Sequence, residues 1–187
     1  MALMTACNKR SLVEGIVKAW SEHEVPPAED LFDDPTHGDE RDAYRTFAGK
    51  RFDEITFYGP GDVPGSFLFM KELGKNYYTA SVILSLLGEV EELGSASVVL
   101  KRGMLTVFDA FEGPFKLRPA QYTHSQQLAA ARAILCMAIS VEANRSLTEL
   151  VDAANTVIGW LHTLPTCDQR RKNLSGLALR YEQLIGS

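Results

Sequence analysis

The first part of the chain has the hydrophobic pattern of an amphipathic helix. Residues 11–14 read Ser-Leu-Val-Glu, which is typical of a helix N-terminus because the serine and glutamate side chains bond each other's backbone amides. Apolar side chains then return every three or four residues as far as Trp20. Pro26 and Pro27 follow, and proline does not continue a helix. We therefore predict a helix over residues 11–23.

Two further helices are predicted before the middle of the chain. Residues 40–48 have the pattern of a short helix, with Asp39 as its N-cap and Gly49 at its end. Residues 77–93 are apolar on almost every side, a pattern typical of a helix in the centre of a domain. We expect the other helices to pack around this central apolar helix.

One segment has the pattern of β-strands. β-Branched residues are frequent in residues 97–102 and 104–108, on both sides of Arg102 and Gly103, and glycine allows the positive φ that a tight turn requires. This pattern predicts a small antiparallel β-hairpin. The fold class that follows is α+β, predominantly α.

The second half of the chain is predicted to be almost entirely helical. Apolar periodicity places helices over about residues 123–143, 146–163 and 168–185, joined by connections of a few residues. Short connections make consecutive helices antiparallel. We therefore expect a C-terminal three-helix bundle.

A chain of 187 residues fits one domain. No long linker interrupts it, so we predict a single domain over residues 1–187, with an α/β half (11–115) and a helical half (120–187). The longest apolar runs are well short of the roughly 20 residues that a membrane-spanning helix needs. The chain starts without the pattern of a secretory signal, and its three cysteines form no disulfide framework. We expect a soluble, cytoplasmic protein with free thiols, either a monomer or a homodimer.

Charge is unevenly distributed along the chain. The formal net charge is −5, which does not favour the clustered basic surface of a nucleic-acid-binding protein. Residues 22–42 contain nine acidic residues and one basic residue. Prolines and a glycine in residues 26–38 oppose regular structure, so we predict an exposed acidic loop there. The candidate partner-binding residues are Asp30, Asp33, Asp34, Asp39 and Glu40.

The C-terminal part of the chain has the opposite charge. Residues 116–187 contain eight basic and five acidic residues. Residues 170–172 read Arg-Arg-Lys at the start of the last predicted helix, where the helix dipole disfavours cations. The acidic loop of the same chain is one neighbour that we expect for this basic run.

No sequence motif indicates catalysis. The chain lacks the GxSxG, P-loop and GxGxxG patterns, and its four histidines are far apart. The acidic loop departs from the alternating oxygen ligands of a calcium loop and has no second histidine for zinc. We therefore predict no catalytic residue, no metal ligand and no cofactor.

Aromatic and glycine positions in the first part of the chain form a recurring order. They are Trp20, Tyr44-x-x-Phe47-x-Gly49-Lys50, Phe67-Leu68-Phe69-Met70, Tyr77-Tyr78 and Leu84-x-x-Leu87. This order, over about residues 11–140, resembles a group of small uncharacterised bacterial domains, and some small acidic proteins of this style serve as immunity proteins beside secreted toxins. The resemblance implies an interaction role and carries over no functional residue.

The expected function is that of a non-enzymatic protein-binding module. An immunity or antitoxin-like inhibitor would bind a basic protein partner, such as a toxin, through the acidic loop. One alternative is a metal-dependent enzyme whose site is assembled around that loop from Asp33, Asp34 and His37. Another is a dimeric helical scaffold, similar to a secretion chaperone, with the helix over residues 77–93 at its interface. Neither a nucleic acid nor a membrane is expected as a partner.

Overall fold

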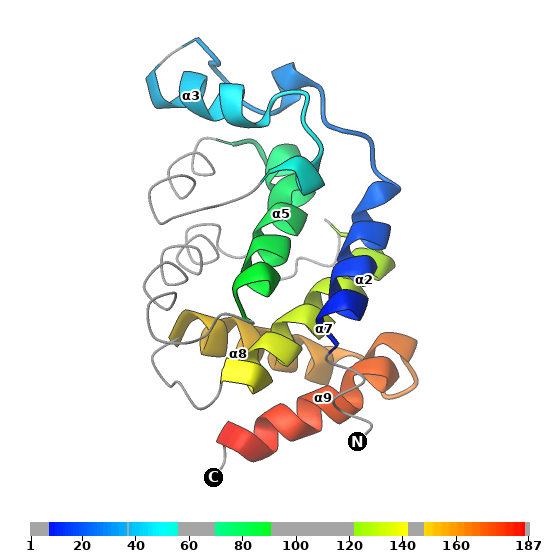
Figure 1. Cartoon of the computed structure of the whole chain (residues 1–187). Coiled ribbons are helices and arrows are strands. Elements are labelled where there is room, and N and C mark those ends of the chain that lie inside the picture. Colours follow the sequence, from blue (N-terminus) through cyan, green and yellow to red (C-terminus); the bar gives the residue numbers. More distant parts are fainter. Residues whose placement is uncertain (1–7, 37, 56–69, 91–121, 142–147, 186–187) are drawn as a thin grey trace.

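The computed structural model describes residues 8–36, 38–55, 70–90, 122–141 and 148–185. Its α-helices all contribute buried side chains to one hydrophobic core (Figure 1). The helices are, in chain order, α2 (Lys9–Ser21), η1 (Ala28–Asp30), α3 (Gly38–Phe47), η2 (Phe52–Glu54), α5 (Glu72–Val90), α7 (His124–Val141), α8 (Thr148–Thr163) and α9 (Gln169–Ile185). The two labelled η are short 3₁₀ helices.

The predicted α+β class is wrong for the part of the chain that the structure describes. These residues form helices and no β-strand; their one β contact is an isolated antiparallel bridge between Phe32 and Met70. A single bridged pair is too short to form a ladder. The predicted hairpin, residues 97–108, lies outside the described residues.

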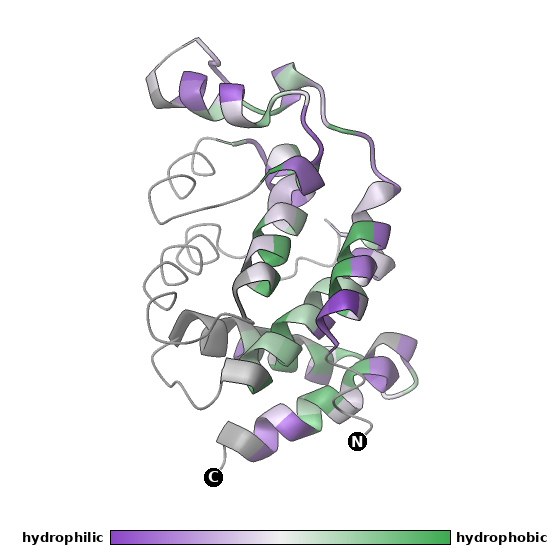
Figure 2. Ribbon diagram, in the orientation of Figure 1, coloured by the Kyte–Doolittle hydropathy of each residue, from purple (hydrophilic) through white to green (hydrophobic). Residues whose placement is uncertain are grey.

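The helix at the centre of the fold is α7. We had predicted that the helix over residues 77–93, which corresponds to α5, would lie there. α7 contacts α2, α5, α8 and α9, whereas α5 contacts α2, α7 and η2. Figure 2 shows both α5 and α7 with apolar residues along the inside of the molecule. α7 is rich in alanine, and small side chains allow neighbouring helices to approach it closely on several sides. The overall hydrophobicity of α5 and α7 is similar, so it did not indicate which of the two lies at the centre of the fold.

The C-terminal three-helix bundle is confirmed. α7, α8 and α9 each contact the other two, and their ends agree with the prediction to within two residues. Polar contacts join α8 to α9 at two points: His162 Nε2 lies 2.7 Å from Glu182 Oε1, and the Tyr181 hydroxyl donates to Asn155 Oδ1 at 3.3 Å. The bundle therefore has an apolar interior and a polar seam.

Two hydrogen bonds show that α2 and α5 run antiparallel. Trp20 Nε1, near the end of α2, donates to the carbonyl of Asn76 in the first part of α5 at 3.0 Å. At the other end, Lys9 Nζ donates to the carbonyl of Gly88 at 3.1 Å. The lysine also places a cation beside the C-terminal end of α5, which the helix dipole favours.

The first helix begins earlier than predicted. Its N-cap is Asn8, whose Oδ1 accepts hydrogen bonds from the backbone amides of Arg10 at 2.9 Å and Ser11 at 3.4 Å. The helix therefore starts two residues before the predicted Ser11 and ends two residues before the predicted residue 23. Asparagine is a strong N-cap residue, so the sequence contains two possible helix starts, Asn8 and the capping-box pattern of residues 11–14. The structure uses Asn8.

One cysteine differs from the prediction of free thiols. Cys136 is buried in α7 and is disulfide-bonded. Cys167, the other cysteine among the described residues, is free and exposed.

The start of α5 packs closely against the acidic part of the chain at Gly74. The predicted helix starts at residue 77, but α5 begins at Glu72 and therefore contains Gly74. A Cβ atom at Gly74 would lie 2.7 Å from Met70 Cγ and 2.8 Å from Leu31 Cδ2. Both of those side chains are buried, so the helix backbone itself forms part of the core surface here.

We predict that Gly74→Ala destabilises the protein by about 1 kcal/mol, because overpacking the core outweighs the better helix propensity of alanine. Gly74→Val should cost more, since its side chain is larger and β-branched. The measurement is the free energy of unfolding from urea denaturation.

The matched control is Gly176→Ala in α9, where an added Cβ meets no atom within 4 Å. This control should stabilise the protein by up to about 1 kcal/mol. Equal effects of the two alanine substitutions would contradict the close contact at Gly74.

Candidate protein-binding surface

The acidic segment, residues 22–42, is attached to the core by two apolar side chains in its middle. Leu31 and Phe32 are 0% and 1% exposed. The amide of Lys71 donates to the Leu31 carbonyl at 2.8 Å, and the Phe32 ring meets the Tyr44 ring edge to face with centroids 6.3 Å apart. The prediction of a wholly exposed loop is therefore wrong: the segment is a short structured strip with a buried centre.

Two of the predicted binding residues project into solvent on either side of this buried pair. Asp30 ends η1 and is exposed, and no ion pair is formed by its side chain among the described residues. Asp33 has a side chain that is 85% exposed and lies 3.3 Å from Lys71 Nζ. The same ammonium donates to the carbonyl of Glu29 at 3.2 Å. Lys71 thus fixes the backbone of the segment and neutralises part of its charge.

The side chains of Asp34 and Glu40 are engaged within the segment. Asp34 Oδ1 accepts from the Thr36 amide at 3.0 Å and from the Thr36 hydroxyl at 2.6 Å. Glu40 Oε2 accepts from the Asp34 amide at 2.8 Å. These two carboxylates therefore hold the connection between η1 and α3. Asp39 lies in the first turn of α3, its side chain is not among those described, and His37 lies outside the described residues.

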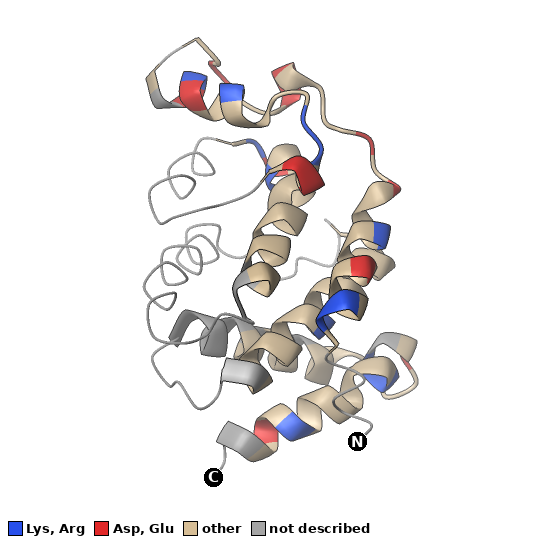
Figure 3. Cartoon of the chain, viewed as in Figure 1, with Lys and Arg blue, Asp and Glu red and all other residues tan. Residues whose placement is uncertain are grey.

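The basic run in α9 is not the neighbour of the acidic segment. Figure 3 shows the acidic residues gathered along the chain from the end of α2 through α3, at the opposite end of the molecule from α9. Arg171 instead donates to the Leu164 carbonyl at 3.0 Å. Among the described residues, Lys71 and two arginines of α3 form ion pairs with carboxylates of the acidic segment: Arg45 lies 3.6 Å from Asp42, and Arg41 lies 3.8 Å from it.

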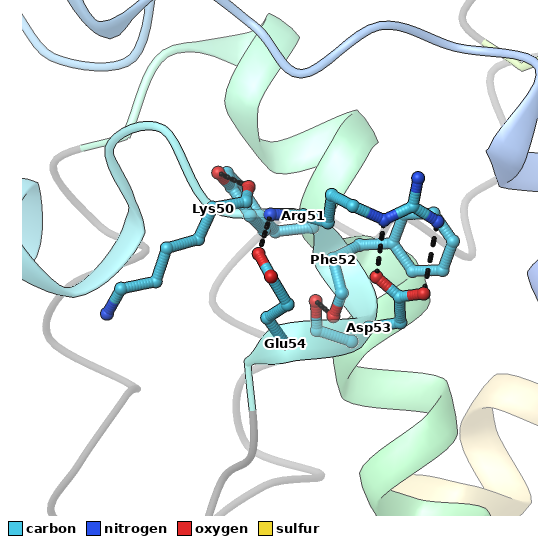
Figure 4. A network of polar contacts seen from close by, with 7 residues as sticks. Lys50, Arg51, Phe52, Asp53 and Glu54 are labelled. Atoms are coloured by element: carbon cyan, nitrogen blue, oxygen red, sulfur yellow. Dashed lines mark hydrogen bonds and ion pairs between the residues drawn. The ribbon is translucent and has the colours of Figure 1, made fainter.

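A second polar cluster lies beside η2 at the same end of the molecule (Figure 4). Arg51 donates from Nε and Nη2 to the two carboxylate oxygens of Asp53, at 3.0 and 3.1 Å. Its amide donates to Glu54 Oε2 at 2.7 Å, and its guanidinium lies 5.8 Å from the centre of the Phe52 ring. The hydrogen bond from Arg51 holds the pKa of Asp53 below its usual value.

Tyr78 of α5 holds the turn that precedes η2. Its hydroxyl lies 2.7 Å from the Phe47 carbonyl and 2.8 Å from the Lys50 carbonyl and donates to them. One turn further along α5, the Ser81 hydroxyl donates to the Phe52 carbonyl at 2.6 Å. Burial raises the pKa of the Tyr78 phenol, so it stays a hydrogen-bond donor at ordinary pH. From the sequence, Tyr78 was expected only as part of the central apolar helix over residues 77–93.

The described residues do not assemble a metal centre. No group of three or more histidine, cysteine, aspartate or glutamate side chains in the described ranges is arranged to hold an ion. The alternative prediction placed a metal site at Asp33, Asp34 and His37. In the structure, Asp33 forms an ion pair with Lys71 and Asp34 accepts a hydrogen bond from Thr36.

Comparison with models of protein families, with curated proteins and with solved structures found no match. No helix in the described part of the chain combines the length and the hydrophobicity needed to cross a membrane.

We predict that the Arg51–Asp53 pair stabilises the fold near neutral pH and not in acid. A carboxyl whose pKa is lowered by folding contributes stability above its unfolded pKa and loses it as the pH falls through the folded value. Because both side chains are substantially exposed, Asp53→Asn should cost less than about 1 kcal/mol at pH 7. Urea unfolding of both proteins from pH 7 to pH 2 should show the difference disappearing in acid.

The matched control is Asp42→Asn, which removes a carboxylate with only longer ion pairs. This substitution should change the free energy of unfolding by little. A difference for Asp53→Asn that grew as the pH fell would contradict the assigned role of Arg51.

Proposed function

We propose that the protein is a non-enzymatic binding module that recognises a basic protein partner through its acidic segment, in the manner of an immunity protein or antitoxin-like inhibitor. The single observation that carries this proposal is the burial of Leu31 and Phe32 between exposed carboxylates. A buried centre holds Asp30 and Asp33 on a defined backbone. Carboxylates held in this way bind a basic surface with less loss of conformational freedom than carboxylates on a disordered tail.

The placement of charge supports the same proposal. The acidic segment and the basic start of α9 lie at opposite ends of the molecule, so the carboxylates are not neutralised by that helix (Figure 3). Separated charge of this kind orients an approaching basic partner and raises the association rate at low ionic strength. Asp30 and Asp33 are the proposed contact residues, while Asp34 and Glu40 support the backbone from within.

The two alternative functions have less support. A metal-dependent enzyme would need ligands that the described residues do not bring together. A dimeric scaffold would need an open apolar face on α5. Most described side chains of α5 are instead buried within this chain, Tyr77, Tyr78 and Ile83 among them.

The test is a charge reversal on the acidic segment. The partner used is the purified product of the gene next to that of this protein. We predict that Asp30→Lys with Asp33→Lys lowers the association rate constant at least tenfold, because the change removes attraction and adds repulsion. Surface plasmon resonance at two salt concentrations measures this change, and the wild-type rate should fall as salt rises.

The control reverses two carboxylates elsewhere, Glu14→Lys with Glu182→Lys, and changes the net charge by the same amount. It should leave most of the association rate intact. If the control and the double substitution at Asp30 and Asp33 slowed association equally, net charge and not the acidic segment would be responsible.

A further inference from the structure

The side chain of Lys71 spans the buried centre of the acidic segment. Its ammonium nitrogen lies 3.3 Å from Asp33 Oδ1 and 3.2 Å from the carbonyl oxygen of Glu29, to which it donates a hydrogen bond. These two oxygens come from residues on either side of the buried pair Leu31 and Phe32. The segment therefore presents a carboxylate and a backbone carbonyl so that one ammonium group, with its three donors, contacts both.

The acidic segment does not depend on this ammonium group for its attachment to the core. The backbone amide of Lys71 donates to the Leu31 carbonyl at 2.8 Å, and Phe32 forms the isolated β bridge with Met70. Leu31, Phe32 and Met70 are all buried. Main-chain bonds and apolar packing thus hold the segment, and its shape should persist when the side chain of Lys71 moves away.

The ion pair itself lies at the surface. The side chain of Asp33 is 85% exposed and that of Lys71 is 38% exposed. Water and salt weaken an exposed ion pair, so a cation from another molecule can replace the lysine at little cost. The contact is therefore one that a basic partner can exchange.

The two carboxylates proposed as contacts differ in whether a cation already lies beside them. Asp33 is paired with Lys71. Asp30 is exposed, and within the described ranges no lysine or arginine lies within ion-pair distance of its carboxylate. A partner's cation gains a new attraction at Asp30, whereas at Asp33 it only replaces an attraction that the chain already has.

We propose, on the basis of the function proposed above, that Lys71 is an internal competitor for the partner. Its ammonium group occupies the position that a lysine of the partner takes between Asp33 and the Glu29 carbonyl, and it leaves this position when the partner binds. One ammonium replaces another, so Asp33 adds little affinity while Lys71 is present. The competition lowers the affinity by no more than about fivefold, because an exposed ion pair contributes little.

The test measures binding of a fluorescein-labelled peptide of ten lysines to the full-length protein. Fluorescence anisotropy gives the Kd at about 0.1 M salt, where charges more than about 10 Å apart are largely screened. Lys71→Met removes the ammonium group and keeps an unbranched apolar side chain. We expect this variant to bind the peptide two- to fivefold more tightly than the wild type.

The matched control is Lys50→Met, which changes the net charge by the same amount. Lys50 is exposed, and Figure 4 shows its side chain directed away from the Arg51–Asp53 pair. It should tighten binding less than Lys71→Met does. Equal tightening by the two variants would show that net charge is responsible and would overturn the proposal.

A double-mutant cycle measures the competition directly. In the wild type, Asp33→Asn should weaken peptide binding less than Asp30→Asn does. In the Lys71→Met background, the loss caused by Asp33→Asn should be at least twofold larger, because Asp33 then has no internal cation to replace. The same loss in both backgrounds would contradict competition by Lys71.

Asp30→Asn separates this inference from the proposed function. It should weaken peptide binding in both backgrounds, by up to about fivefold. Binding that depends on neither Asp30 nor Asp33 would overturn the proposed function, and the role of Lys71 with it. Binding that depends on Asp30, with no coupling between Asp33 and Lys71, would overturn only the role of Lys71. The substituted side chains are exposed or half-buried, so the variants should fold, which urea unfolding checks.

Discussion

The packing of Leu31 against the start of α5, and of Phe32 beside Met70 just before it, is the constraint on which the acidic surface depends. Gly74 has no side chain, so Leu31 and Met70 reach the helix backbone directly. This contact fixes the segment on both sides of the buried pair, and Lys71 adds a bond to its backbone. Without the packing of this buried pair, the neighbouring carboxylates would lie on a mobile chain and repel one another, and they would form no defined surface.

The sequence predicted the helices well where the apolar period was long and clear. The C-terminal bundle followed from that period and from its short connections. The prediction failed where two signals competed or where tertiary contact decided. Asn8 caps the first helix ahead of the predicted start at Ser11. α5 starts five residues before the predicted residue 77, and its first turn holds Gly74, where the helix backbone approaches Leu31, 43 residues away in sequence.

The candidate surface was predictable in location and not in detail. A charged segment can be recognised from the sequence alone, because it needs only a run of acidic residues. The sequence pattern does not show which carboxylates are free to face solvent, because this depends on their contacts. Asp34 accepts a hydrogen bond from Thr36, and Asp33 forms an ion pair with Lys71, which is distant in sequence. The same reason explains why the basic run of α9 was matched to the acidic segment, since opposite charge along a sequence does not fix proximity in space.

The double attachment of α2 to α5 restricts how this protein can vary in evolution. Trp20 and Lys9 bond to opposite ends of the same helix, so the number of residues between them must match the distance between two fixed acceptors. One inserted residue would advance the rest of α2 by about 1.5 Å and rotate it by about 100°, moving one of the two donors out of reach. Homologous chains should therefore differ in α2 by substitution, with insertions and deletions confined to the connections around it.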